Sequence, residues 1–254
     1  MESKPAYIVS DIHLGAVPHA TERAFRAFLD HVAAEAGSLL INGDLFDFWF
    51  EYRSVILREH YRVAAKLADV VETGVPVSFV GGNHDAWVGS FLRDEIGMRL
   101  LDGPLEMELG GRRALVAHGD GVGRGDYKYR ALRRVIRHPA SVAAFRALHP
   151  DWGRGIAGLA SSTEHKAGTG DKASSGRAAF IEEWAVEQLG AMPEIELVVA
   201  GHSHVPAMKE VLPGRFYVNA GDWIRSFTYV VLPTDGGAPE LRTWPAMDVA
   251  GGTG

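Results

Sequence analysis

The chain has 254 residues, of which 46% are hydrophobic and 23% charged, a composition typical of a soluble globular protein and unlike that of a disordered or fibrous one. Its 26 Lys and Arg against 32 Asp and Glu give a net charge of −6, which argues against a general nucleic-acid binder, so we expect no nucleic-acid partner. Cysteine is absent, which excludes disulfides, thiolate nucleophiles and Cys-bound zinc.

The N-terminal residues lack the apolar run of a signal peptide. No stretch of about 18 apolar residues occurs that would span a membrane as a helix. We therefore expect a cytoplasmic protein, with any membrane contact being peripheral and on the inner face.

Short runs rich in β-branched residues recur along the chain and indicate strands that are buried on both faces. They lie at residues 6–10, 38–41, 75–80, 114–117, 197–200, 216–218 and 227–232. Between the first three runs, apolar residues with helical spacing predict helices at 21–36 and 55–72, with Thr21 as the N-cap of the first. This alternation predicts an α/β fold with crossover connections.

The interval from residue 121 to 189 interrupts this alternation, because it contains no convincing strand. We expect three helices in it, at 126–137, 141–148 and 176–189. A segment rich in Gly, Ser, Thr and Lys at 161–177 is predicted to be a mobile loop. We interpret the interval as a helical cap inserted into a single domain over residues 1–244, followed by a flexible tail at 245–254.

Potential metal ligands follow five of the predicted strands, at the carboxyl ends where open α/β sheets place their sites. Four of the five clusters also contain a glycine, which suits a tight turn at a crowded position. The candidate ligands are Asp11, His13, Asp44, Asn83, His118, His202 and His204. One such cluster is a weak signal, and the prediction depends on finding five in succession.

Carboxylate, amide and imidazole ligands without sulfur suit Mn²⁺, Zn²⁺, Fe or Mg²⁺, of which Mn²⁺ is our first expectation. Seven ligands exceed what one ion needs, so we predict two divalent ions that share a carboxylate. Two such ions bring a charge of +4, and Asp11 and Asp44 return −2. The remaining +2 would attract a phosphate group, so we expect a phosphate-containing substrate.

The order of these clusters resembles the five-block signature of the calcineurin-like metallophosphoesterases. The matching blocks are Asp11-x-His13, Gly43-Asp44, Gly82-Asn83-His84-Asp85, His118-Gly119-Asp120 and Gly201-His202-Ser203-His204. The resemblance implies a four-layer α/β fold, a β-sandwich of two mixed sheets flanked by helices.

The same resemblance implies roles for individual residues. One ion would be held by Asp11, His13 and His204, the other by Asn83, His118 and His202, with Asp44 bridging the two. His84 would act beside the phosphate as a general acid or as a donor to the developing charge, with Asp85 holding its ring. The nucleophile would be a metal-bound hydroxide.

Further segments, among them Gly43–Trp49 and Gly201–Pro206, are similar to the UDP-2,3-diacylglucosamine pyrophosphatase branch of this family. This similarity implies hydrolysis of the pyrophosphate of a lipid A precursor to UMP and a diacylated sugar phosphate. The implied substrate contacts are Asp126, Tyr127, Arg130, Ser162, Lys166 and Lys172, although a solubilising loop also explains the last three. Well-known members of the branch have Arg where this chain has His84, so the substrate stays open.

Residues 121–156 contain eight basic and two acidic side chains, a net charge of +6. A basic amphipathic helix at 126–137 can rest on an anionic membrane, where each Lys or Arg contributes about 1 kcal/mol. An ordinary solvated helix, or a basic rim that serves only substrate phosphates, explains the same pattern.

Three other functions are alternatives. The first is a general phosphodiesterase or phosphomonoesterase of the same family with a different substrate. The second is a non-enzymatic scaffold, which the complete ligand set argues against. The third is a metallo-β-lactamase-type hydrolase, which would need a His-x-His-x-Asp-His run that the chain lacks. The sequence does not determine the oligomeric state.

Overall fold

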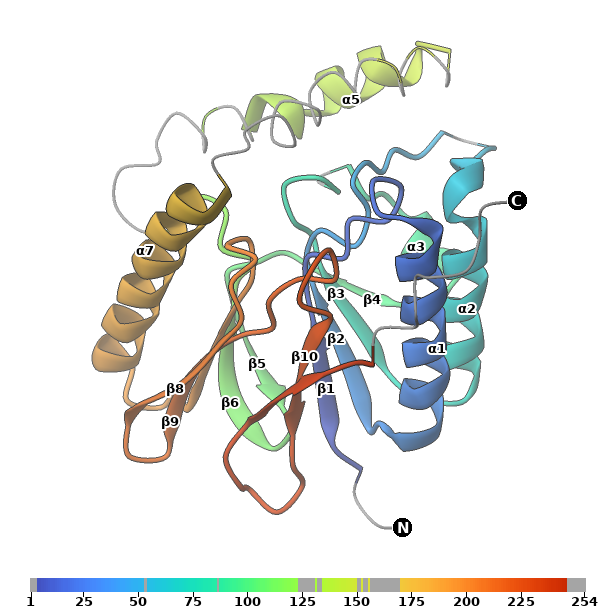
Figure 1. The fold of residues 1–254 in the computed structure, drawn as a ribbon. Coiled ribbons are helices and arrows are strands. Elements are labelled where there is room, and N and C mark those ends of the chain that lie inside the picture. The colour runs from blue at the N-terminus through green and yellow to red at the C-terminus, as the bar shows by residue number, and fades with distance from the viewer. Residues whose placement is uncertain are drawn as a thin grey trace.

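The structure is a computed structural model that describes residues 4–52, 54–85, 87–122, 131, 134–149, 152, 155 and 170–245, with the side chains of 170–174 excepted. Two mixed sheets form its centre (Figure 1). The first has the strand order β11-β10-β1-β2-β3-β4 and the second the order β5-β6-β7-β9-β8.

The first sheet is parallel from β1 to β4, and β10 and β11 extend it with antiparallel pairs. Its strands are β1 (Ala6–Val9), β2 (Ser38–Asn42), β3 (Val77–Val80), β4 (Arg99–Leu101), β10 (Thr228–Leu232) and β11 (Glu240–Thr243). The second sheet is parallel over β6, β7 and β9, with an antiparallel strand at each edge. Its strands are β5 (Leu105–Leu109), β6 (Arg112–Val116), β7 (Leu197–Ala200), β8 (Ala207–Leu212) and β9 (Arg215–Asn219).

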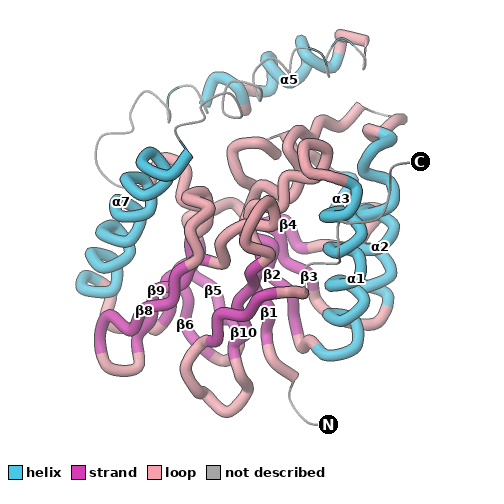
Figure 2. Tube along the Cα trace, in the orientation of Figure 1, coloured by secondary structure: helices cyan, strands magenta, loops and turns pink. Residues whose placement is uncertain are grey.

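Helices cover the outer faces of both sheets (Figure 2). The described helices are α1 (His19–Glu35), the 3₁₀ turn η1 (Arg58–His60), α2 (Tyr61–Glu72), α3 (Phe91–Asp94), α5 (Pro139–Arg146) and α7 (Gly170–Ala191). Alternate strand residues face different layers: Tyr7 and Val9 pack under α1 and α2, whereas Ile8 packs between the sheets with Val116 and Val199. The predicted four-layer α/β fold is confirmed.

Each predicted strand overlaps an observed strand, and the predicted helices at 21–36 and 55–72 correspond to α1 and to η1 with α2. The prediction of Thr21 as an N-cap is wrong. The helix begins two residues earlier, after Pro18, and the Thr21 side chain is buried inside its first turns.

The predicted cap needs a correction at its C-terminal end. Residues 176–189 belong to α7, which begins at Gly170 and packs on the outer face of the second sheet, so they form a layer of the core. The helical residues 170–177 also contradict the predicted loop there. Most of residues 123–169 lie outside the described residues, so the cap boundaries stay a prediction, as does the tail, of which only Pro245 is described.

The part of the cap that the structure describes contacts the loop after β2. Arg146 of α5 donates from Nε to the carbonyl oxygen of Glu51 at 3.3 Å, and the ring of Phe145 lies 4.6 Å from those of Phe50 and Trp87. None of the helices within the described ranges combines the length and apolarity that a membrane crossing requires.

Candidate metal centre

The predicted ligands lie on five loops at the carboxyl ends of strands, and the two sheets contribute different ones. Asp11 and His13 follow β1, Asp44 follows β2 and Asn83 follows β3, all in the first sheet. In the second sheet, His118 follows β6, and His202 and His204 follow β7.

The ligand atoms of these side chains form overlapping clusters in which all members lie within 4.8 Å of one another. The clusters are Asp11, His13 and His204; His13, Asp44 and His84; and Asp44, His118 and His202. His13 links the first cluster to the second, and Asp44 links the second to the third. Asn83 lies between Gly82 and His84, which both contact Asp44. The structure therefore brings all seven residues to one place.

Buried ligand atoms without a hydrogen-bond partner indicate whether a metal ion fits this site. Oδ1 of Asp11, Nε2 of His13, Oδ1 of Asn83 and Nε2 of His118 are buried and accept no hydrogen bond from any part of the chain that the structure describes. Buried polar atoms are rarely left unpaired, so four at one site require an explanation. Oxygen and imidazole nitrogen together suit a borderline divalent cation, and the residues present fit such an ion.

Hydrogen bonds on the outer side of the rings fix which nitrogen faces the centre. Nδ1 of His118 lies 2.8 Å from the carbonyl oxygen of Asn42, and Nδ1 of His84 lies 2.9 Å from that of Asp47. A carbonyl oxygen only accepts, so each Nδ1 carries a proton and Nε2 is the nitrogen left for the centre. Nδ1 of His13 likewise lies 3.3 Å from Oδ1 of Asp47. This is the arrangement by which proteins orient metal-binding histidines.

Asp222 performs the same task for His204, and the sequence analysis missed it. Its Oδ2 lies 3.5 Å from Nδ1 of His204, whose Nε2 lies 3.5 Å from Oδ1 of Asp11. Its Oδ1 accepts the backbone N–H groups of Arg225 and Ser226. A signal existed: Asp222 follows β9 after Ala220 and Gly221, the same pattern of small residues and a carboxylate beyond a strand.

The electrostatics of the cluster favour positive charge beside Asp44. Although burial opposes its ionisation, the pKa of Asp44 lies well below its usual value because the His118, His13 and His84 rings surround it. Asp44 in turn raises the pKa of buried His118 well above its usual value. Burial lowers the pKa of His202 to about 3, with the charge of His118 acting in the same direction. His202 is therefore neutral, as a metal ligand must be.

The backbone at the ligand positions is unusual. Among the described residues, six that are not glycine have a positive φ, and five of them are Asp11, His13, Asp44, His202 and His204, with φ from 52° to 63°. Such conformations cost on the order of 1–3 kcal/mol each and persist only where the surrounding structure enforces them. Their concentration here marks the loops as shaped for the site.

Two of the predicted turn glycines are required by space. Gly43 has a φ of 84°, and a side chain there would overlap the ring of His118. A side chain at Gly82 would overlap the carboxylate and backbone of Asp44. Both positions therefore let a ligand from another loop approach the backbone closely.

The predicted role of Asp85 as the residue that holds the His84 ring is wrong. Asp85 accepts the backbone N–H groups of Gly82 at 2.7 Å and Leu45 at 2.8 Å, so it joins two ligand loops. Its burial and the neighbouring Asp44 raise the pKa of Asp85 to about 6. The ring of His84 is instead held by Asp47, and its backbone N–H donates to Oδ1 of Asp44 at 2.9 Å.

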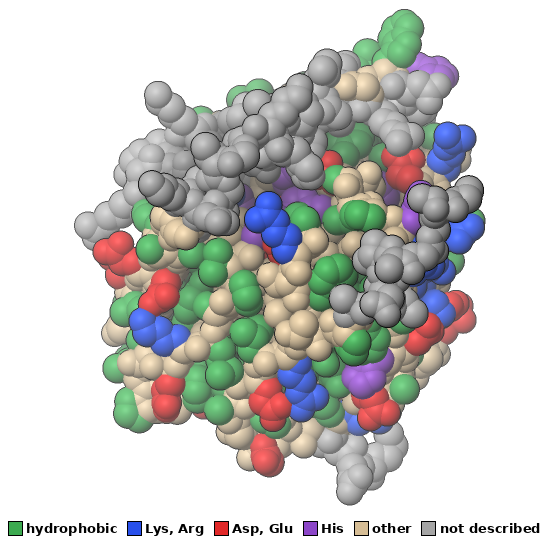
Figure 3. All heavy atoms as spheres, in the orientation of Figure 1, with side chains coloured by type: hydrophobic (Ala, Val, Ile, Leu, Met, Phe, Trp, Pro, Cys, Tyr) green, Lys and Arg blue, Asp and Glu red, His purple; other side chains and the backbone are tan. Residues whose placement is uncertain are grey.

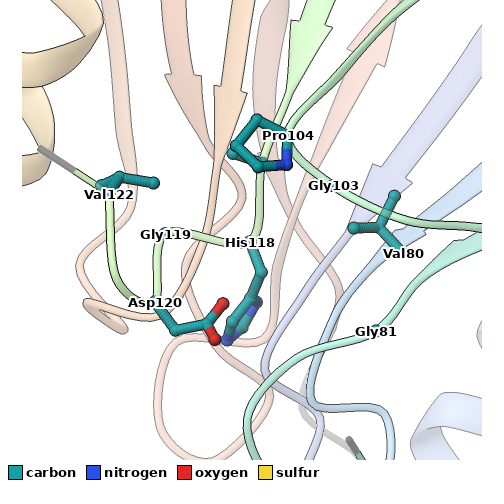
Figure 4. A pocket seen from close by; sticks show the side chains of 9 residues that line it. Val80, Gly81, Gly103, Pro104, His118, Gly119, Asp120 and Val122 are labelled. Carbon is teal, nitrogen blue, oxygen red and sulfur yellow. The ribbon is translucent and has the colours of Figure 1, made fainter. Parts of the chain in front are cut away.

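The centre reaches the surface at His202 and His204, which are half-buried. Figure 3 shows histidine side chains at the surface of this face, some of them with a cationic side chain beside them. Beside His118 lies a cavity of about 10 Å³, which is room for one water molecule. Gly81, Gly103 and Asp120 are among its lining residues (Figure 4).

The predicted substrate contacts are not placed. Asp126, Tyr127, Arg130, Ser162 and Lys166 lie outside the described residues, as does the side chain of Lys172 in α7. These six contacts stay predictions.

The sequence profile of the Calcineurin-like phosphoesterase family matches residues 4–206. A UDP-2,3-diacylglucosamine hydrolase from Porphyromonas gingivalis is 33% identical over 248 residues, which cover 91% of this chain and 94% of that protein. The enzyme of the same name from Escherichia coli is 30% identical over 230 residues, 89% of this chain and 94% of that protein. A dimetal phosphatase from Danio rerio aligns with a TM-score of 0.45 at 12% identity, covering 96% of this chain and 100% of that chain. Together with the geometry above, the family match identifies the chain as a member of the calcineurin-like phosphoesterase family and a metal-dependent hydrolase.

Proposed function

We propose that the chain hydrolyses the pyrophosphate bond of UDP-2,3-diacylglucosamine, or of a similar lipid-linked nucleotide, in the biosynthesis of lipid A. The observation that carries the proposal is the pair of ligand clusters that share Asp44. The substrate rests on the relatives from P. gingivalis and E. coli, which match this chain over about nine-tenths of its length.

In this proposal, two divalent ions occupy the centre. Asp11, His13 and His204 would hold one, Asn83, His118 and His202 would hold the other, and Asp44 would serve both. The buried, unpaired ligand atoms support this division, and Mn²⁺ is the ion that we expect first. The chemistry that such ions supply is Lewis acidity, which brings the pKa of water near neutrality and offsets phosphate charge.

His84 is the proposed proton donor of the reaction. Its Nδ1–H donates to the carbonyl oxygen of Asp47, which leaves Nε2 as the nitrogen that faces the cluster. A positioned histidine there can protonate the leaving oxygen or donate a hydrogen bond to the developing charge. Asp47 serves both His84 and His13, so one residue orients two rings of the site.

A general phosphodiesterase or phosphomonoesterase is the second candidate. The observation that favours it is His84 itself, because the resemblance to the lipid A branch implies Arg at this position. A different donor beside the phosphate is compatible with a different ester.

We also propose peripheral contact with the inner face of the membrane through the basic interval 121–156. Among its described residues, Trp152 is 70% exposed and Val135 is 62% exposed next to exposed Arg134. Exposed apolar side chains beside basic ones are the combination that binds an anionic bilayer. A membrane location would bring the enzyme to the acyl chains of the proposed substrate.

The test is product identification with protein reconstituted with Mn²⁺. UDP-2,3-diacylglucosamine in detergent micelles, bis(4-nitrophenyl) phosphate and 4-nitrophenyl phosphate are offered separately, and products are identified by mass spectrometry. We expect UMP and a diacylated sugar phosphate from the lipid nucleotide. Turnover confined to the two chromogenic esters would replace the first candidate with the second.

A further inference from the structure

One face of α7 packs on the second sheet and ends beside the metal centre. Ile181, Trp184, Ala185 and Leu189 are buried against that sheet at helical spacing. Ile181 marks the end of this stripe. A side-chain carbon built on Gly119 would lie 3.1 Å from Cδ1 of Ile181 and 3.2 Å from Cβ of His202.

The residue one turn before Ile181 on the same stripe is Arg177. Side chains of a helix lean toward its N-terminus, and the N-terminal end of α7 lies toward the carboxyl ends of the strands of the second sheet (Figure 1). Its side chain is half-buried. Its charge acts on His202, since it adds to burial and His118 in lowering the pKa of that ring.

Within the part of the chain that the structure describes, Arg177 makes no hydrogen bond or ion pair, although both ligand carboxylates, Asp11 and Asp44, are described. A half-buried guanidinium next to a site that binds cations is repelled by them unless an anion lies between. Phosphate oxygens match the guanidinium fork and are its preferred anionic partners. The unpaired cation therefore points to an anionic group of the substrate.

We propose that Arg177 binds the second phosphate of the substrate, the one that is not attacked. This inference rests on the proposed function, and it assigns α7 a part in substrate selection. The attacked phosphate belongs at the ions, whereas Arg177 makes no ion pair with the carboxylates Asp11 and Asp44 that would hold them. A cation at this place favours pyrophosphate diesters over esters with a single phosphate.

Arg177→Gln and Arg177→Lys test the proposal, with Arg99→Gln as the matched control. Arg99 is an exposed arginine at the start of edge strand β4, away from the carboxyl ends of the strands. For Arg177→Gln we expect kcat/KM on the lipid nucleotide to fall about 10- to 100-fold, mainly through KM, since one charge-assisted hydrogen bond is lost. Turnover of bis(4-nitrophenyl) phosphate and metal content should not change. Arg177→Lys keeps the positive charge, so its kcat/KM on the lipid nucleotide should fall less than that of Arg177→Gln.

Calorimetric binding of UDP and UMP to the Mn²⁺-loaded protein separates this inference from the proposed function. Arg177→Gln should weaken UDP about 10-fold and leave UMP unchanged, because only UDP carries a second phosphate. This result supports the role of Arg177 even if the lipid nucleotide is not a substrate. Equal losses for UDP and UMP, unchanged UDP binding, or loss of metal would each overturn the inference.

Discussion

The first sheet supplies both carboxylates, the amide and one imidazole of the centre, whereas the second supplies three imidazoles and no carboxylate ligand. Hydrogen bonds join the two contributions: the backbone N–H of His202 donates to Oδ2 of Asp11 at 3.0 Å, and Nδ2 of Asn42 donates to the carbonyl oxygen of Ala117 at 2.9 Å. Negative charge is thus buried on one sheet and stabilised by N–H groups and rings from the other. Loss of Asp44, the carboxylate of the first sheet that both ions would share, should disturb both ions, whereas loss of a single ligand from the second sheet should disturb only one.

Asp44→Ala is expected to have the largest effect. Asp44 belongs to two of the three ligand clusters, so its loss should remove both ions and reduce activity by more than the 10²–10⁴-fold share of an acid–base group. Metal content by mass spectrometry and turnover of bis(4-nitrophenyl) phosphate measure the two effects. Glu108→Gln, on an exposed residue of edge strand β5, makes the same change of charge and should leave both unaltered. An Asp44→Ala protein that kept one ion and most of its activity would contradict the shared role.

His84→Ala should separate chemistry from metal binding on the first sheet. His84 lies in one cluster with His13 and Asp44, but we assign it to proton transfer. The kcat should fall on the order of 10²–10⁴-fold while both ions stay bound. If the variant loses metal instead, His84 is a ligand and its assignment is wrong.

Asp222→Asn probes the second sheet and should have the smallest effect. The substitution weakens the hold on Nδ1 of His204, and loss of such an orienting partner costs about 10- to 100-fold in metal affinity. Titration of the metal-free protein with Mn²⁺ should show one weakened and one unchanged site. Asp235→Asn, in the turn between β10 and β11, removes an exposed carboxylate and serves as the control. Equal weakening of both sites would contradict the assignment of His204 to one ion.

The interior of the fold was predictable from the sequence, and its edges were not. Every predicted strand lies inside a sheet, because interior strands are apolar on both faces and stand out as continuous runs. The missed strands are β4, β5, β8 and β11, which are the four edges of the two sheets. β5 alternates exposed and half-buried residues, and β8 is largely exposed, so neither forms an apolar run.

The positions of the candidate ligands were predictable for a related reason. The carboxyl ends of neighbouring parallel strands converge, so residues that follow such strands meet in space. The supporting residues were not predictable in this way: Asp47, and not Asp85, holds the ring of His84, through a contact between loops. The face of α7 that packs on the second sheet was also not predictable, because apolar and polar residues are spread almost evenly around this helix.

The left-handed backbone at Asp11, His13, Asp44, His202 and His204 implies a conflict between catalysis and thermal resistance. Glycine adopts this conformation without the penalty of roughly 1–2 kcal/mol that other residues incur. Replacing one of these ligands with glycine would therefore relieve backbone strain and inactivate the enzyme in the same substitution. Directed evolution of this scaffold for heat tolerance alone would favour loss of the ligands, so such a selection must include turnover.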